Sequence, residues 1–159
     1  MILSPHISLA VPAHARDIAE MSREYIEYGL GWSWTQARVL KAIHDPSTNV
    51  AVVREQDALL GFGIMRYGER RAHLVLLGVH LDHRKRGLGA LLLAWLEKCA
   101  VTAGLEHIQV EARADNEAAL AFYQDQGYRR QGIVPGYYRG MIDAIKLEKA
   151  LFRARPANA

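Results

Sequence analysis

Cysteine is almost missing from this chain, since Cys99 is the only one among 159 residues. Intrachain disulfides and a cluster of thiolate metal ligands are therefore excluded. No apolar run approaches the ~20 residues that span a bilayer, and the N-terminus lacks the basic and then apolar pattern of a secretory signal. We therefore expect no membrane partner and a cytoplasmic location. Cys99 falls on the apolar side of a predicted helix, where a buried structural thiol is favoured over a nucleophile.

The chain also has little excess charge, because 20 basic residues against 17 acidic ones give a formal net charge of +3. It shows neither the basic face of a recognition helix nor the alternation of aromatic and basic residues that binds single strands. Much of the excess lies at residues 84–86 and around Arg153 and Arg155. A phosphate-bearing ligand explains this clustering, so we expect no nucleic-acid partner. A nucleic-acid module stays a rival hypothesis that charge alone favours.

What the chain does have is an ordinary globular composition with half of its residues apolar. This predicts one domain over residues 1–152 and a disordered tail over 153–159. Alternating apolar residues predict strands, at 6–12, 49–54, 59–67, 72–81, 107–112, 128–133 and 142–147. Helical periodicity predicts helices at 13–28, 87–103 and 117–126, and another that Thr35 or Ser33 caps and that stops at 45–47. The strands at 49–54, 59–67 and 72–81 predict an antiparallel meander.

A basic, glycine-containing turn, Arg84-Lys85-Arg86-Gly87-Leu88-Gly89-Ala90, connects a predicted strand to a predicted helix. The first N–H groups of a helix have no partner within it, and the helix dipole adds partial positive charge there. Gly87 and Gly89 lack side chains, so a phosphate could approach the main chain closely. The turn matches neither the GxxxxGK[ST] nor the GxGxxG pattern. We therefore expect a phosphate or diphosphate ligand that is not bound in the manner of those motifs.

A second motif follows in the predicted helix at 117–126. Asn116, Ala119, Tyr123, Gly127 and Tyr128 fit the pattern Asn-x-x-Ala-x-x-x-Tyr-x-x-x-Gly-Phe/Tyr. With the Arg-x-x-Gly-x-Gly-Ala turn before it, this order and spacing resemble the GNAT N-acetyltransferases.

Several shorter segments resemble one branch of that family, the enzymes that acetylate protein N-termini, including the ribosomal-protein alanine acetyltransferase. The run Val110-Glu111-Ala112-Arg113-Ala114-Asp115-Asn116 is similar to that branch's Glu-Val-Arg-x-x-Asn run. Trp34-Thr35 is similar to its Pro-Trp-Ser/Thr element, with Ser33 in place of the proline. Tyr137-Tyr138 followed by Asp143-Ala144-Ile145 is similar to its Tyr-Tyr…Asp-Ala-Ile ending.

The resemblance implies a mixed α/β fold with a central sheet that is antiparallel at first and has helices on both faces. The sheet is expected to splay between the two motif strands, 74–81 and 107–112, and to hold acetyl-CoA in that opening. No metal is implied, and a homodimer is left open. The residues expected to hold the cosubstrate are Val79, Leu81, Arg84, Arg86, Gly87, Leu88, Gly89, Ala90, Asn116 and Tyr123.

Acetyl transfer from a thioester needs a neutral amine, a polarised carbonyl and a proton for the departing thiolate. Tyr123 is the candidate general acid, because a phenol is protonated at neutral pH; the alternative is a tyrosine packed in the core. Glu111 is the candidate base, acting through water, and the alternative is an outward-facing strand residue. Asn116 could bond the pantetheine amides, cap the helix, or do both.

The acceptor side is expected to involve Trp32, Trp34, Tyr137 and Tyr138. The tryptophans could form a mobile lid, although stapling of the two helices to the sheet is favoured. The tyrosines could line the acceptor groove or pack on the last strand. His80 and His83 lack the further ligands that a metal site needs.

The predicted function is transfer of an acetyl group from acetyl-CoA to a primary amine by direct attack, with a protein or peptide N-terminus as the leading acceptor. The alternatives are a small amine, such as an amino sugar, a polyamine or an amino acid, and a non-catalytic regulator that binds CoA.

Overall fold

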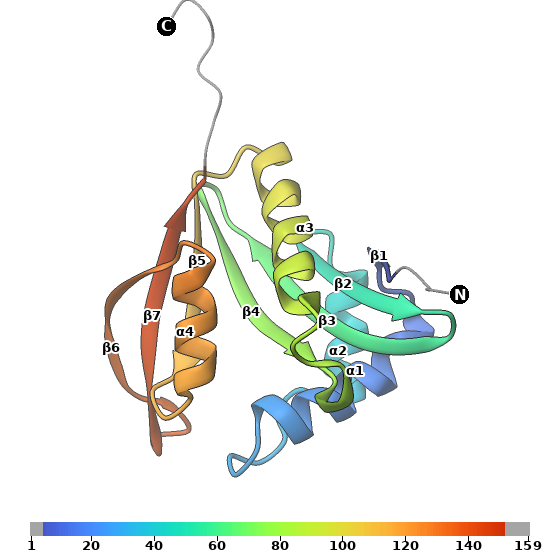
Figure 1. The fold of residues 1–159 in the computed structure, drawn as a ribbon, viewed down its shortest axis with the longest axis horizontal. Coiled ribbons are helices and arrows are strands. Elements are labelled where there is room, and N and C mark those ends of the chain that lie inside the picture. Colours follow the sequence, from blue (N-terminus) through green and yellow to red (C-terminus); the bar gives the residue numbers. More distant parts are fainter. Residues whose placement is uncertain (1–4, 152–159) are drawn as a thin grey trace, which may run out of the picture. The chain divides into compact units, whose positions relative to one another are not determined.

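Seven strands form one mixed sheet in a computed structural model that describes residues 5–151. The strands neighbour one another in the order β1-β2-β3-β4-β5-β7-β6 (Figure 1). The helices are α1 (Ala15–Met21), α2 (Gln36–His44), α3 (Leu88–Thr102) and α4 (Glu117–Asp125). The strands are β1 (His6–Leu9), β2 (Thr48–Glu55), β3 (Ala58–Tyr67), β4 (Arg71–Val79), β5 (His107–Arg113), β6 (Arg129–Tyr138) and β7 (Ile142–Ala150). The predicted mixed α/β class is confirmed.

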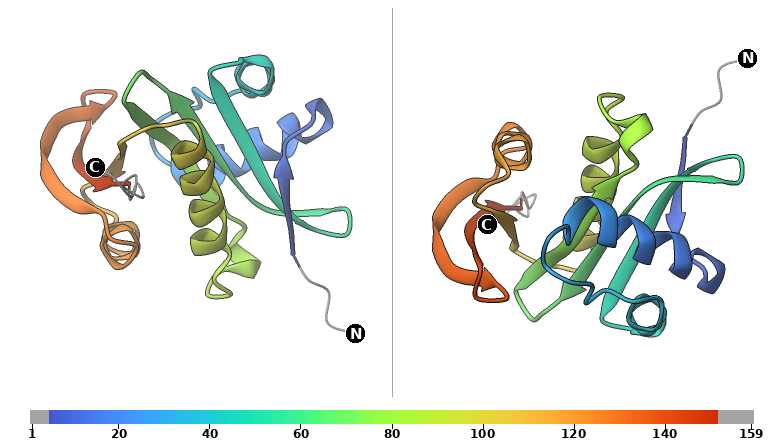
Figure 2. Two further views of the ribbon diagram at one scale, coloured as in Figure 1. Left: turned by 90° about the horizontal axis from the view of Figure 1, so that it is seen from above. Right: turned by 90° about the horizontal axis from the view of Figure 1, so that it is seen from below.

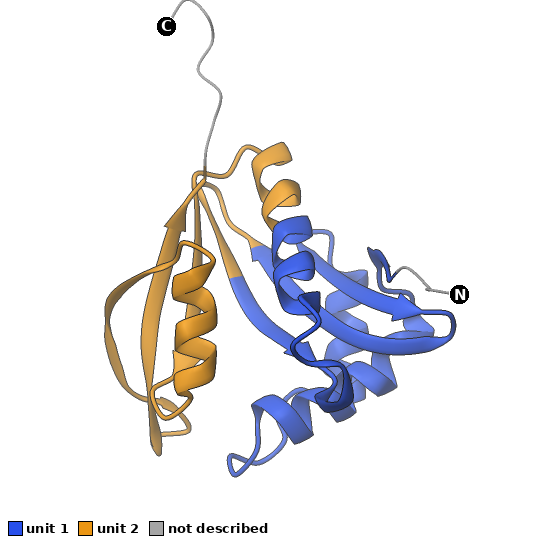
Figure 3. Ribbon diagram, in the orientation of Figure 1, with its two compact units in different colours: residues 1–66, 74–96 blue, residues 67–73, 97–159 orange. Residues whose placement is uncertain are grey.

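The chain divides into two compact units, shown in separate colours in Figure 3. Unit 1 comprises residues 1–66 and 74–96, and unit 2 comprises residues 67–73 and 97–159. The boundary passes through β4 and α3, so both elements contribute to each unit. The prediction of one domain over residues 1–152, and that of a splayed sheet, stay predictions. The predicted tail lies outside the described residues.

In unit 1 the strands carry helices on both faces, as Figure 2 shows for α3 on one side and for α1 and α2 on the other. Strand β2 pairs antiparallel with β1 and with β3, as the predicted meander requires. Side chains alternate between the faces of a strand, and Phe62 and Ile64 of β3 join the core under α1 and α2. The remaining buried members of that core are Ala15, Ile18, Ala19, Met21, Trp34, Val39, Val50, Val52 and Leu76.

The other face of β3 lies unusually close to α3, and two glycines make that approach possible. A Cβ added at Gly63 would lie 2.7 Å from Leu96 Cδ1, and one added at Gly61 would lie 3.2 Å from Leu92 Cδ1, both atoms of α3. The first distance is shorter than real Cβ contacts and the second is tight, so the missing side chains let α3 lie against the strand. This packing holds α3, the helix that follows the basic turn, against the sheet.

In unit 2, strand β7 pairs antiparallel with both β5 and β6, and α4 runs alongside these strands (Figure 1). Asn116 caps α4, with its Oδ1 accepting from the Ala119 N–H at 3.1 Å. Alternating residues of β5, namely Ile108, Val110 and Ala112, are buried, whereas Gln109 and Glu111 point the other way. Strand β5 therefore presents Gln109 and Glu111 on the face away from its apolar side chains.

Five predicted boundaries were wrong. Strand β7 runs to Ala150, three residues past its expected end at Leu147. The helix expected at 13–28 is α-helical only to Met21 and continues as a wider π-helical turn, Ser22–Ile26. Strand β1 ends at Leu9, three residues before the expected limit at Pro12. Strand β4 ends at Val79, so Leu81 begins a 3₁₀ turn.

The fifth concerns β6, which was expected to end at residue 133 and runs on to Tyr138, with register shifts after Arg130 and Val134. Pro135 and Gly136 lie within the second shift, between Val134 and Tyr138. Proline cannot donate a hydrogen bond to a neighbouring strand, so it is found at such irregularities. Because Pro135 interrupts the strand pattern, the sequence did not predict that β6 continues to Tyr138.

Candidate functional site

The basic turn lies in unit 1 and leads into α3 as predicted. Lys85 has φ of +65° and Gly87 has φ of +76°, so the chain reverses sharply just before the helix. The Leu91 N–H bonds to the Gly87 carbonyl at 3.0 Å, which leaves the amides of Leu88, Gly89 and Ala90 as the unpaired first donors of α3. A Cβ at Gly87 would meet no atom within 4 Å. Open space therefore borders this glycine, and a diphosphate fits that setting.

The arginines of the turn are tied to the protein rather than free at its rim. Arg86 donates to Glu55 Oε2 at 2.8 Å and lies 2.9 Å from His83 Nδ1. Arg84 donates from Nε to the Val79 carbonyl at 3.2 Å, and its guanidinium lies 5.1 Å from the centre of the Tyr25 ring. The Glu55 carboxylate therefore binds the Arg86 guanidinium, which is predicted to bind a phosphate.

The end of β4 is where Val79 and Leu81 were expected to hold the pantetheine arm. The strand keeps its alternation as far as Val79, with Leu76 and Gly78 buried and Val79 partly exposed. Leu81 is 59% exposed. Leu88 is buried, so only its main chain could contact a ligand in the turn.

Tyr123 lies on α4 in unit 2, and 7% of it is exposed. Burial, and then the nearby Tyr138, raise the pKa of its phenol far above the ordinary value, so it is protonated at any pH near neutral. Its ring meets Phe122 and Tyr128 edge to face. Its hydroxyl makes no hydrogen bond within residues 5–151. The burial and the ring contacts fit the core-packed alternative, whereas the backbone hydrogen bond that this alternative predicted is not seen, and the role of general acid stays a prediction.

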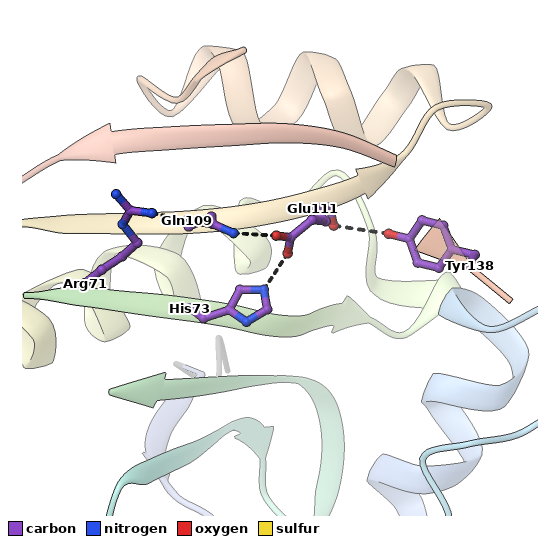
Figure 4. Close-up of polar contacts among 5 residues, drawn as sticks. All are labelled: Arg71, His73, Gln109, Glu111 and Tyr138. Carbon is purple, nitrogen blue, oxygen red and sulfur yellow. Dashed lines mark hydrogen bonds and ion pairs between the residues drawn. The ribbon is translucent and has the colours of Figure 1, made fainter. Parts of the chain in front are cut away.

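Glu111 of β5 belongs to a chain of polar contacts that runs between β4 and β5 (Figure 4). One carboxylate oxygen, Oε2, bonds to His73 Nε2 from β4, and the other, Oε1, accepts from Gln109 Nε2 at 2.6 Å. Arg71 Nη1 donates to Gln109 Oε1 at 3.0 Å, which orients the amide so that its NH₂ faces Glu111. Sequence reasoning found Glu111 and missed its two partners, His73 and Gln109, and the Arg71 that orients Gln109.

Burial alone would raise the pKa of the Glu111 carboxyl. The hydrogen bonds from His73 and Gln109, together with the charges of His73 and Lys146, outweigh burial and hold this pKa below its ordinary value. The side chain is only 7% exposed. The alternative of an outward-facing glutamate in solvent does not fit this side chain, which is buried and bonded on both oxygens.

Asn116 caps α4, and its amide NH₂ makes no hydrogen bond within the described part of the chain. Arg113, which is buried, holds the preceding loop through Asp115, at 3.1 Å from Nε to Oδ1 and 3.3 Å from Nη2 to Oδ2. The capping role is therefore seen, and the pantetheine role stays a prediction.

Trp32 and Trp34 are held in place in unit 1. Trp34 is 6% exposed and belongs to the core, with the Arg38 guanidinium 3.9 Å from its ring centre. Trp32 is 38% exposed, yet its indole N–H donates to the Ala19 carbonyl at 3.1 Å. These contacts favour the stapling interpretation, and the exposed edge of Trp32 is the part that could meet an acceptor.

Glu27, which sequence reasoning missed, fixes the loop that carries these tryptophans. Its buried carboxylate accepts from Ser22 Oγ at 3.0 Å, from the Ser33 N–H at 2.8 Å and from the Trp34 N–H at 3.2 Å, and it also bonds Ser33 Oγ. A buried carboxylate needs such donors. Its spacing from Ser33, with glycines between, was the only signal in the sequence.

Tyr138 and Tyr137 lie at the end of β6. The Tyr138 hydroxyl donates to the Glu111 carbonyl oxygen at 3.2 Å (Figure 4), and burial raises the pKa of this phenol. Tyr137 is 44% exposed and meets Tyr138 edge to face. Tyr138 thus adjoins the backbone of the candidate base, whereas Tyr137 faces solvent.

Among the described residues, no group of three His, Cys, Asp or Glu side chains is arranged to hold a metal ion. His80 Nδ1 accepts from the Asp82 N–H at 3.2 Å and caps the 3₁₀ turn. Cys99 is half-buried, and burial raises the pKa of its thiol, which disfavours the reactive thiolate. Over the same residues, no helix has the length and apolarity that membrane crossing requires.

Comparisons with known proteins agree with the motifs. The family model described as acetyltransferase (GNAT) family matches residues 15–128. An acetyltransferase of Yersinia enterocolitica is 31% identical over 103 residues, which cover 65% of this chain and 72% of that protein.

Two solved structures show the shared fold. The ribosomal-protein-S18-alanine N-acetyltransferase of Escherichia coli has a TM-score of 0.80 at 22% identity, covering 97% of this chain and 98% of that one. An aminoglycoside 6′-N-acetyltransferase complexed with coenzyme A has a TM-score of 0.81 at 20% identity, covering 95% and 99%.

Proposed function

The chain belongs to the acetyltransferase (GNAT) family, and from that premise we propose that it transfers the acetyl group of acetyl-CoA to a primary amine, most favourably the N-terminal amine of a protein or peptide. The observation that carries the proposal is the hydroxyl of Tyr123. It is nearly buried, remains protonated at neutral pH and makes no hydrogen bond within the described residues. Such a group suits proton donation to a departing thiolate.

The basic turn supports the choice of cosubstrate. Three unpaired helix amides, with open space beside Gly87 and two arginines nearby, are donors that a diphosphate can bridge. Residues 84–90 would hold the diphosphate, and Val79 with Asn116 would bond the pantetheine arm. The cosubstrate supplies the activated acyl group.

The reaction proposed is direct attack. The amine nitrogen attacks the thioester carbonyl carbon, the C–S bond breaks, and Tyr123 protonates the sulfur. Glu111 and the side chains bonded to it, His73 and Gln109, would remove the proton of the acceptor ammonium. No covalent enzyme intermediate is needed, in keeping with the half-buried Cys99 whose thiolate is disfavoured.

Three features favour an N-terminal amine as acceptor. The Glu111 strand, the paired tyrosines 137–138 and the Trp34-Thr35 segment resemble the N-terminal acetyltransferase branch, and the chain shares its fold with the ribosomal-protein-S18-alanine N-acetyltransferase. A small-molecule amine is the second candidate, because the chain shares the same fold with an aminoglycoside acetyltransferase to a similar degree. We also retain a cytoplasmic location as part of the proposal.

The test is to offer acetyl-CoA with a panel of N-terminal peptides, aminoglycosides, polyamines and amino acids, while following both free thiol and acetylated product. The expected result is thiol release that depends on the amine and is fastest with peptides. Fast transfer only to small amines would overturn the proposal that the acceptor is an N-terminal amine. Tight CoA binding without turnover on any amine would show a non-catalytic CoA-binding protein. Nucleic-acid binding that falls steeply with salt and that CoA does not displace would show instead that the basic turn binds nucleic acid.

A further inference from the structure

The carboxylate of Glu111 is poorly placed to take a proton from an acceptor itself. Its two oxygens are bonded to His73 and Gln109, and its side chain is 7% exposed. Its depressed pKa makes it a weak base. A group that must meet an incoming amine needs exposure, and the Glu111 side chain has little of it.

His73 has that exposure. Its side chain is 31% exposed, and Figure 4 shows one ring nitrogen turned toward Glu111 with the second on the side away from the carboxylate. That second nitrogen, Nδ1, has no hydrogen-bond partner in residues 5–151. Because a buried carboxylate accepts the proton of Nε2–H, it leaves the lone pair on Nδ1. A base held by a buried carboxylate is the arrangement that recurs in hydrolase triads.

From this geometry we infer that His73 is the residue that receives the proton of the acceptor ammonium, directly or through one water, and that Glu111 is a positioning residue which fixes the imidazole tautomer and orientation. The inference rests on the proposed function and revises the role of Glu111 within it. It assigns a catalytic role to a residue that lies outside both sequence motifs.

The groups around the pair fit this division of roles. Gln109, oriented by Arg71, occupies the second oxygen of Glu111. Lys146 lies opposite Glu111 on β7, and Tyr138 of β6 bonds the Glu111 carbonyl. Arg71 also pairs with the acidic Glu148 of β7 at 3.7 Å. The hydrogen bonds from His73 and Gln109 and the charge of Lys146 keep Glu111 ionised, so the carboxylate remains the hydrogen-bond acceptor that orients His73.

The protons balance over one turnover. The ammonium gives its first proton to His73 Nδ1, and the neutral amine then attacks the thioester carbon while the C–S bond breaks. The nitrogen loses a second proton as the amide forms. Of the two protons, one ends on the sulfur through Tyr123, and the other leaves to solvent from His73.

The experiment compares His73→Gln, Glu111→Gln and the control His107→Gln, measuring kcat/KM for a peptide acceptor from pH 6 to 10 and the Kd for CoA. His107 forms another His–Glu pair in unit 2, with Glu148 at 3.9 Å and 40% side-chain exposure. We expect His73→Gln to lower kcat/KM about 10²-fold at pH 7, Glu111→Gln to lower it less, and His107→Gln to leave it unchanged, all with unaltered CoA affinity.

The pH profile separates catalysis from structure. An N-terminal amine loses its proton near pH 8 without help, so the His73→Gln defect should shrink steadily above that pH, whereas a purely structural defect would persist. An active wild type with His73→Gln within twofold of it, or with a pH-independent loss, overturns the inference alone. A wild type that acetylates no amine overturns the proposed function and the inference together.

A measurement on the unaltered protein covers the case in which the variant does not fold. The ¹⁵N chemical shifts of His73 report which ring nitrogen carries the proton in the neutral form. The inference expects the proton on Nε2 and a bare Nδ1. A proton on Nδ1 would overturn it.

Discussion

The basic turn of unit 1 and the polar array of unit 2 differ in the groups that they offer and in the task that we propose for each. The turn is exposed and offers main-chain amides of α3, with Gly87 leaving open space for a ligand. The array surrounds the buried carboxylate of Glu111 and consists of side chains that fix one another, from Arg71 through Gln109 and Glu111 to His73. Binding an anion needs donors that a ligand can reach, whereas moving a proton needs groups held in one orientation. We therefore expect unit 1 to set cosubstrate affinity and unit 2 to set the rate of chemistry.

The largest effect should come from Tyr123→Phe in unit 2. Loss of the proton donor is expected to lower the single-turnover rate about 10²-fold, with the Kd for CoA unchanged, as measured by rapid quench and titration calorimetry. Tyr128→Phe is the matched control. Tyr128 adjoins Tyr123, and its hydroxyl donates to Glu97 at 2.8 Å, so it should lose stability but not rate. Equal losses of rate in both variants would contradict the assignment of the acid.

The next effect should come from Gly87→Ala in unit 1. A non-glycine residue at φ of +76° costs about 1–2 kcal/mol, and the added methyl enters the space predicted for the diphosphate. We expect the Kd for CoA to rise about 5- to 30-fold while the rate at saturating acetyl-CoA is kept. Gly29→Ala is the control, because Gly29 has the same φ of +76° and the same open surroundings. If Gly29→Ala weakens CoA binding as much, general strain and not the turn is responsible.

A smaller effect is expected from Tyr138→Phe. Removing a hydroxyl that donates to the Glu111 carbonyl should lower the free energy of unfolding by about 1 kcal/mol and reduce the rate only through looser positioning of β5. Chemical denaturation measures the first quantity. A large loss of rate with unchanged stability would instead give Tyr138 a direct place in the reaction.

The smallest effect should come from Glu55→Gln. Glu55 holds Arg86 at 2.8 Å, so its neutralisation should free the guanidinium for phosphate and lower the Kd for CoA by a few-fold, about 1 kcal/mol or less. Asp57→Asn is the control, because it removes the same charge two residues away, from a side chain that does not contact Arg86 among the described residues. If both variants tighten binding equally, the gain is general electrostatics and the Glu55–Arg86 pair has no special role.

The comparison of the two regions also explains what the sequence could predict. The basic turn and the α4 motif are local, since glycines, arginines and the Asn116–Tyr123 spacing lie within single strand–helix segments. The partner of Glu111 is 38 residues away on another strand, and no local pattern pairs His73 with it. Once β4 and β5 are known to be neighbours, Arg71 and His73 against Gln109 and Glu111 show the alternation that places them on one face.

Other details depended on contacts that a single sequence does not contain. The π-helical turn at Ser22–Ile26 ends where Glu27 donates its N–H to the Ser22 carbonyl and accepts from the Ser22 hydroxyl. The path of β6 past Pro135 depends on pairing with β7. Side-chain hydrogen bonds of Glu27 to Ser22, Ser33 and Trp34 in the first region, and strand pairing in the second, outweigh local propensity. Element types were therefore predicted better than their ends.

The most direct test of this division of roles is the single-turnover rate of acetyl transfer at saturating acetyl-CoA for Gly87→Ala and Tyr123→Phe, measured side by side with wild type. The account predicts a near-normal rate for the turn variant and a rate about 10²-fold lower for the tyrosine variant. A normal rate for Tyr123→Phe, or a slow one for Gly87→Ala despite saturation, would contradict it.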